Sequence, residues 1–320
     1  MDSAYQTLPA FLTALLFAAS AICGKRLSDL YGGLAASFFR LLLAVILLGA
    51  GVLFLGERGF LAPGVFGWIL LSGLVGFGYG DVTLYLAFSR IGSRLVLLIV
   101  SATGPVFALL AESLWLGAHP RGVELAAMSV IGLGLLVALW PSAAPGEDRP
   151  VRAGGAGSWV GGVFLAIQAG LGQGLGVVLS RRADVASDHE TLMGAFSPAL
   201  GQTFLRVSAG CAVAFFSWQI GKRFFQGEQF RAAPEAAPSA TRATAWLVGA
   251  ATFGPVLGVT CMQWALFFLP GGLCLAIIAL APLLIIPLSA WLEGDRPTPR
   301  SLAGTLLAVA GVAWISVTRV

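Results

Sequence analysis

A few ionisable side chains, chiefly Arg40, Asp81 and Arg206, lie deep inside long apolar runs of this sequence. A guanidinium can bind a carboxylate through paired hydrogen bonds, and a carboxylate can hold a proton or a cation. Such charges are costly inside a membrane, so they are functional candidates when they face protein or a water-filled cavity. These residues are the first candidates for a binding or coupling site.

Arg40 and Asp81 are expected to form a buried ion pair. Arg40 lies about seven residues after the start of its run, and Asp81 lies about seven residues before the end of its run. These two ends face the same side of the membrane, so at about 1.5 Å per residue both groups lie at a depth of roughly 10 Å. Their runs are consecutive, so the two groups come within reach of each other. The pair either stabilises packing or has a functional role, and both interpretations stay open. Asp81 is a candidate proton carrier, although a stable partner in Arg40 would oppose its protonation.

Polar and aromatic side chains in other apolar runs could line a cavity with hydrogen-bonding groups and aromatic faces. Buried glutamine is at least as often a hydrogen-bonding group between helices, so a packing role stays open for each of them. The candidates are Tyr79, Tyr85, Gln168, Gln173, Gln202, Gln263 and Trp264.

The composition indicates that these residues lie in a membrane protein. Of the 320 residues, 58% are hydrophobic and 11% are charged, whereas a soluble domain has roughly a quarter charged residues. At roughly 20 apolar residues per crossing, the chain could supply about ten transmembrane helices. The runs are about twice the length of a barrel strand. We therefore expect an all-α integral membrane protein.

Apolar runs between charged or Pro/Gly-rich breaks predict the helices. The first run counts as a helix because its leading residues lack the basic charge of a signal peptide. The expected helices cover residues 8–24, 33–56, 65–88, 93–116, 122–140, 159–180, 198–220, 245–268, 271–292 and 301–317.

The sequence repeats itself across a Pro-rich segment near its midpoint. Pro105 corresponds to Pro282 and Gly134 to Gly311 in one ungapped register. We therefore divide the chain into a first five-helix repeat (1–141), a linker (142–158) and a second five-helix repeat (159–320). An odd number of crossings in each half gives the two repeats opposite membrane orientations.

The repeat relates Arg206 to Arg40, but the position equivalent to Asp81 is Gly258. We therefore expect Arg206 to receive a substrate carboxylate through its two-donor fork. In the alternatives, Arg206 extends to the membrane interface or pairs with Glu112.

Several classes of site lack support in the sequence. The four cysteines have no CxxC spacing or histidine partner, so no disulfide, metal or cofactor is expected. No GxxxxGK[ST], HExxH or GxSxG motif occurs. A membrane-embedded enzyme and a non-transporting scaffold remain the alternatives to a transporter. A net charge of +4 without basic blocks does not indicate nucleic-acid binding.

Several segments resemble the EamA branch of the drug/metabolite transporter superfamily. They are GDVTLYLAFSRIGSRL (80–95), SATGPVFALLAE (101–112), the Ala-Pro at 281–282 and Glu-Gly-Asp at 293–295. Lys25 and Arg40 also resemble family positions, although LGA at 116–118 departs from the usual LGE. The resemblance implies ten helices and export or exchange of small metabolites across the inner membrane.

We therefore expect a secondary transporter that carries an amino acid or related carboxylate by alternating access, with export as the expected direction. Its other partners would be the lipid bilayer and a coupling proton. Lys25, Glu112, Arg40 and Asp81 are the coupling candidates. The distribution of loop Lys and Arg places both termini outside the cell, whereas the resemblance implies cytoplasmic termini. We follow the resemblance.

Overall fold

The computed structural model describes residues 2–56, 58, 61–116, 122–139, 155–184, 194–224, 240–269, 271–292 and 298–319, and these residues are largely helical. The first half contains α1 (Asp2–Tyr31), α2 (Gly33–Leu55), α3 (Pro63–Gly73), the π-helix η2 (Leu74–Asp81), α4 (Val82–Leu116) and α5 (Gly122–Leu139). The second half contains α6 (Gly155–Asp184), α7 (Phe196–Phe224), α8 (Ala240–Ala251), the π-helix η4 (Thr252–Gly258), α9 (Val259–Phe268), α10 (Gly271–Ile278), α11 (Ala281–Leu292) and α12 (Pro299–Arg319).

The helices have the length and apolar character of membrane spans. Among the described residues, six helical stretches are long and apolar enough to cross a membrane. The longest, Pro63–Trp115, contains the two expected helices 65–88 and 93–116. The structure therefore agrees with an all-α membrane protein, whereas the number of ten crossings stays a prediction.

A backbone break at Gly92 divides this longest stretch. Gly92 has a φ of 78°, inside the otherwise continuous α4. A positive φ is easily adopted only by glycine. The break lies between the expected helices 65–88 and 93–116, where the sequence predicted a connection.

One expected helix is interrupted. The range 271–292 was predicted as a single helix, but α10 and α11 are separated by a turn at 279–280. Pro282 lies at the second residue of α11, where its missing N–H costs little because the first N–H groups of a helix have no partner within that helix. The apolar run was continuous, so hydrophobicity alone did not indicate this turn.

Two wider helical turns occur at equivalent places in the two halves. The register that relates Pro105 to Pro282 also relates η2 to η4. π-helical turns are rare in proteins, and many of those that occur lie at functional sites. The sequence predicted helix at both places but not this change of helical form.

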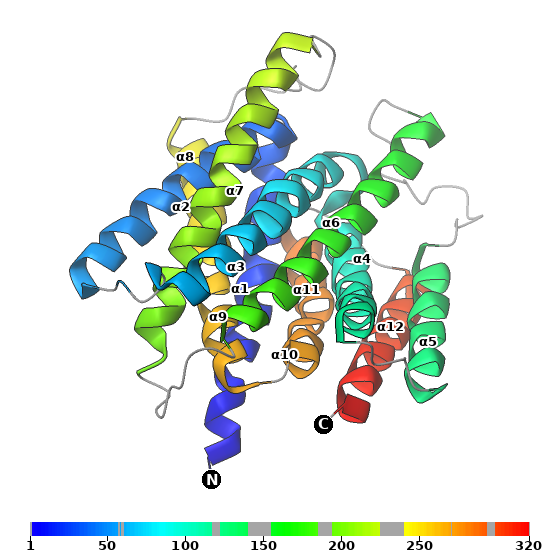
Figure 1. Cartoon of the computed structure of the whole chain (residues 1–320). Coiled ribbons are helices and arrows are strands. Elements are labelled where there is room, and N and C mark those ends of the chain that lie inside the picture. Colours follow the sequence, from blue (N-terminus) through cyan, green and yellow to red (C-terminus); the bar gives the residue numbers. More distant parts are fainter. Residues whose placement is uncertain are drawn as a thin grey trace.

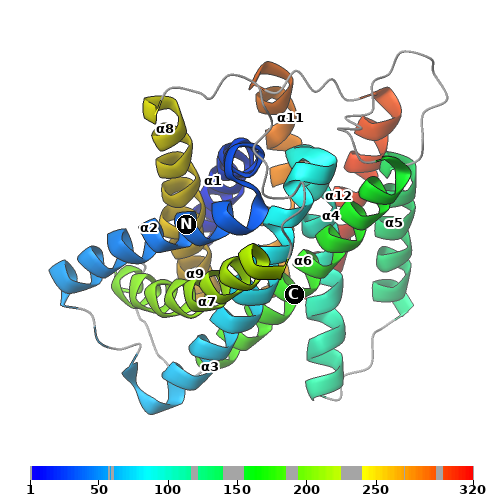
Figure 2. The ribbon, with the colours of Figure 1, turned by 90° about the horizontal axis from the view of Figure 1, so that it is seen from above.

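The two halves pack against each other reciprocally. α1 contacts α8, η4 and α9, and α6 contacts α3, η2 and α4. The equivalent helices α2 and α7 also pack together, as do α5 and α12, at opposite edges of the molecule (Figures 1 and 2). The centre is therefore enclosed by elements of both halves.

Small residues allow the closest approach between α6 and η2. A Cβ added to Gly172 would lie 2.5 Å from the Cα of Gly80. Glycine at a helix interface lets two backbones approach without side-chain interference. This approach places η2 against the centre of the molecule.

Parts of several predictions lie outside the described residues. Of the predicted linker, residues 155–158 belong to α6 and the rest is outside. The Glu-Gly-Asp segment at 293–295 also lies outside.

Candidate functional site

A cavity of about 120 Å³ lies between η2 and η4, with further walls from α1, α2, α4, α6, α7 and α9. An apolar cavity of about 150 Å³ can hold a molecule of the size of benzene. The cavity is therefore suited to a small molecule. Five of the residues that the sequence singled out line it: Arg40, Asp81, Tyr85, Gln173 and Arg206.

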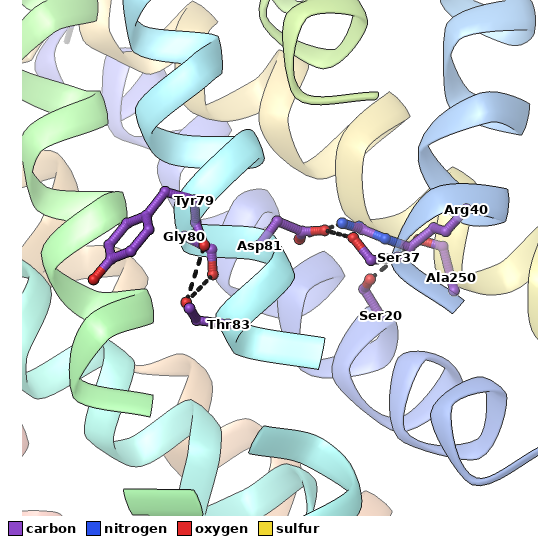
Figure 3. A network of polar contacts seen from close by, with 8 residues as sticks. All are labelled: Ser20, Ser37, Arg40, Tyr79, Gly80, Asp81, Thr83 and Ala250. Atoms are coloured by element: carbon purple, nitrogen blue, oxygen red, sulfur yellow. Dashed lines mark hydrogen bonds and ion pairs between the residues drawn. The ribbon is translucent and has the colours of Figure 1, made fainter. Parts of the chain in front are cut away.

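Arg40 of α2 and Asp81 of η2 form a buried ion pair at this cavity. Arg40 Nη2 donates to Asp81 Oδ1, and the side chains are only 5% and 7% exposed. Ser37 lies one helical turn before Arg40, and its hydroxyl donates to Asp81 Oδ2 over 2.8 Å (Figure 3). Both carboxylate oxygens therefore accept hydrogen bonds within the protein.

The aromatic ring of Tyr85 lies under the same guanidinium. Arg40 Cζ is 4.7 Å from the centre of the ring. A guanidinium over an aromatic face is attracted by the ring's electron density. Tyr85 is buried and follows Asp81 by about one helical turn, so it helps to fix the orientation of Arg40.

Arg206 of α7 has a different set of partners. Its Nη1 donates to the side-chain oxygen of Gln263 over 2.6 Å, and the Gln263 amide in turn donates to Gln202 over 2.8 Å. Arg206 is 2% exposed, and its guanidinium lies 5.5 Å from the Phe77 ring centre. The guanidinium points inward, so the alternative in which it extends to the membrane interface is wrong.

Each arginine touches the π-helical segment of the opposite half. A Cβ on Gly254 of η4 would lie 2.7 Å from Arg40 Nη1. A Cβ on Gly76 of η2 would lie 3.3 Å from Arg206 Nη2. Glycine at both places makes room for a guanidinium between the halves.

The described lining contains two arginines and one aspartate, and therefore one more positive than negative charge. Gln202 and Gln263 do not line the cavity; Gln263 accepts a hydrogen bond from Arg206 and donates one to Gln202. Because the cavity is partly desolvated, an anion gains more from these charges than it would in water.

Four other predicted residues lie away from the cavity. Tyr79 is 41% exposed and points away from Asp81 (Figure 3), because residues two apart on a helix lie on roughly opposite sides. Trp264 packs edge-on against Phe196 with ring centres 5.3 Å apart. Gln168 and Glu112 are partly buried and are not among the lining residues.

Lys25 also lies outside the cavity lining. Its Nζ is 2.6 Å from Asp29 Oδ2, one turn further along α1. A pair at this spacing stabilises a helix locally and does not require a coupling role.

The sequence interpretation missed Ser37 and Ser20. Ser37 precedes Arg40 by three residues, so the spacing indicated a shared helix face. Ser20 lines the cavity and donates to the carbonyl oxygen of Ala250 over 3.2 Å (Figure 3). This contact joins the two halves, so no local signal in the sequence could reveal it.

The sequence profile of the EamA-like transporter family matches residues 7–140 and again residues 160–317. This chain belongs to the EamA-like transporter family. The match covers two repeats, as the internal correspondence predicted, and it confirms the resemblance. The chain is therefore a multi-pass membrane protein of a family that transports small molecules.

Structural comparison agrees with the family assignment. A solved structure described as "Crystal structure of protein" aligns with a TM-score of 0.62 and 18% identity, over 98% of this chain and 97% of that chain. This similarity supports the fold alone. No curated protein matches the chain significantly.

Metal-binding groups do not gather in the described part of this EamA-like chain. No group of three or more His, Cys, Asp or Glu side chains there could hold a metal ion. Cys23, Cys211, Cys261 and Cys274 are buried free thiols.

Proposed function

We propose that this EamA-like protein is a secondary transporter that carries a small carboxylate through the cavity between its two repeats. The class includes amino acids and related acids. The observation that carries the proposal is the net positive charge of the described lining, which contains Arg40 and Arg206 but only one acid, Asp81. A substrate anion would balance this charge.

Arg206 is the proposed substrate counter-charge. The Gln263 amide orients the guanidinium without adding a negative charge. Arginine presents a planar fork of donors that matches a carboxylate, and lysine does not. The Phe77 ring beside Arg206 would contact an apolar part of the substrate.

Alternating access is the proposed mechanism, with ten crossings arranged as two inverted five-helix repeats, 1–141 and 159–320. The reciprocal packing of α1 on α8–α9 and of α6 on α3–α4 supports this arrangement. In inverted-repeat transporters, one part rocks against another around a central site. We extend the proposal to export across the inner membrane, with cytoplasmic termini. Coupling to a proton would use Asp81.

The two alternative functions have less support. A non-transporting scaffold would be expected to have a packed centre, whereas the described residues enclose a cavity there. The family assignment favours transport over a membrane-embedded enzyme.

The test is carboxylate transport by the purified protein in liposomes. Arg206→Lys should weaken apparent substrate affinity while the protein still folds, and Arg206→Gln should weaken it further. Lys222→Gln is the control, because it removes a charge from the same helix where Lys222 covers the Trp218 ring outside the cavity. Unchanged apparent affinity in Arg206→Gln would show that Arg206 is structural.

A further inference from the structure

The carboxylate of Asp81 is already matched within the protein. Its Oδ1 accepts a hydrogen bond from Arg40, and its Oδ2 accepts one from the Ser37 hydroxyl over 2.8 Å. A second cation would therefore compete with Arg40 for the same charge. Asp81 is the acid that the described lining contains, so an incoming ammonium group would find no independent carboxylate there.

An α-amino acid brings such an ammonium group into the cavity. The ammonium is attached to the carbon next to the carboxylate, so a carboxylate bound at Arg206 carries the ammonium in with it. There it would lie close to guanidinium groups, and a desolvated charge without a counter-charge is unfavourable. A carboxylate without the ammonium balances the surplus positive charge and adds no new one.

The remaining walls favour an apolar substrate body. Phe77 lines the cavity beside Arg206, and Leu84, Phe88, Val259 and Met262 extend the apolar surface. Their contacts suit a branched or aromatic side chain.

We propose that the cavity selects apolar monocarboxylates that lack an α-ammonium group, such as 2-oxo acids, over the amino acids of the same shape. This inference rests on the proposed carboxylate function and specifies the substrate class of the same site.

Calorimetric binding to the full-length protein in lipid nanodiscs tests the selection. Leucine is compared with 4-methyl-2-oxopentanoate, and phenylalanine with phenylpyruvate. 4-Methylpentanoate, which has neither an oxo nor an ammonium group, separates the cost of the ammonium from any gain from the carbonyl. The oxo acids and 4-methylpentanoate should bind at least about tenfold more tightly than the amino acids, because burying the ammonium group without a counter-charge is costly.

A gain of charge at Gln173 provides a second measurement. Gln173 lines the cavity, and Gln173→Glu adds an acid that can receive an ammonium or neutralise an arginine. In either case, the preference for the oxo acid should fall about tenfold. Gln168→Glu adds the same charge to α6 away from the lining, and it should leave the preference unchanged.

The possible results separate the two proposals. Equal or tighter binding of the amino acids by the wild-type protein overturns the selection and leaves carboxylate transport intact. An unchanged preference in a folded Gln173→Glu protein also overturns it. If none of the carboxylates binds, the proposed function itself fails, and the selection fails with it.

Discussion

Arg40 and Arg206 show how a repeated residue can acquire different surroundings. An aromatic ring lies beside each guanidinium, but Arg40 has a carboxylate partner, whereas Arg206 donates to the first of two linked amides. The difference in charge follows from one position, because Asp81 of the first half corresponds to Gly258 of the second. A glycine cannot supply a charge, so the two sides of the cavity are electrostatically unequal.

We expect Arg40 and Asp81 to be energetically coupled. Changing either one to alanine leaves a buried charge uncompensated and should cost about 3–5 kcal/mol in stability. Exchanging the two residues restores opposite charges at the same depth and should recover part of the folded protein. Unfolding in detergent measures each variant, and a double-alanine defect equal to the sum of the single defects would contradict the coupling.

At the scale of elements, η2 and η4 shape the cavity from opposite halves. η4 contains Pro255, which has no N–H to donate. In a π-helix that N–H would bind the carbonyl five residues earlier, which is that of Ala250. The Ser20 hydroxyl of α1 donates to this same oxygen and replaces the missing bond. A side chain of one half therefore completes the backbone of the other.

Ser20→Ala should reduce stability by about 1 kcal/mol, since it leaves a buried carbonyl without its donor. In a Pro255→Ala background the backbone N–H is available, so the same change should cost less. Thermal unfolding of the four proteins in one detergent gives the difference. An equal cost of Ser20→Ala in both backgrounds would show that the hydroxyl does not replace the missing N–H.

The close contact between α6 and η2 can be tested by adding a methyl group to glycines of α6. Gly172→Ala places a Cβ 2.5 Å from the Gly80 Cα, where backbone must move, and should cost about 1–3 kcal/mol. Gly161→Ala on the same helix meets nothing within 4 Å and should be neutral or slightly stabilising. Similar losses in the two variants, measured by thermal unfolding, would argue against a specific contact.

For the whole molecule, the two repeats enclose a hollow centre that neither could form alone. The EamA profile matches both halves, and helices of both halves supply the walls. In the proposed alternating access, this central site would be exposed on either side of the membrane in turn.

Single cysteines at two connections test the orientation. With cytoplasmic termini, Ser239→Cys should react with an impermeant maleimide in intact cells, whereas Ser187→Cys should react only after permeabilisation. The four native thiols are at most 9% exposed and should react slowly. The reverse labelling pattern would show that the distribution of Lys and Arg indicated the orientation correctly.

The sequence by itself determined the membrane class and the two-part organisation. Apolar runs make helices the only local structure that satisfies the backbone in lipid, and matched residues such as Pro105 and Pro282 indicate a repeat. The pairing of Arg40 with Asp81 could also be predicted, because the two residues lie at similar depths in consecutive apolar runs. These features depend on composition and spacing, which are local properties of the chain.

Only the tertiary structure decided which residues meet at the centre. The meeting of Gln263 with Arg206 depends on how α9 packs against α7, and Tyr79 turns outward because η2 presents its opposite side to the cavity. The π-helical form of η2 and η4 was equally inaccessible from the apolar pattern, since continuous hydrophobicity does not distinguish α from π turns. Contacts between halves, such as Ser20 with Ala250, join residues 230 positions apart. Their energies arise from packing that no local sequence pattern encodes.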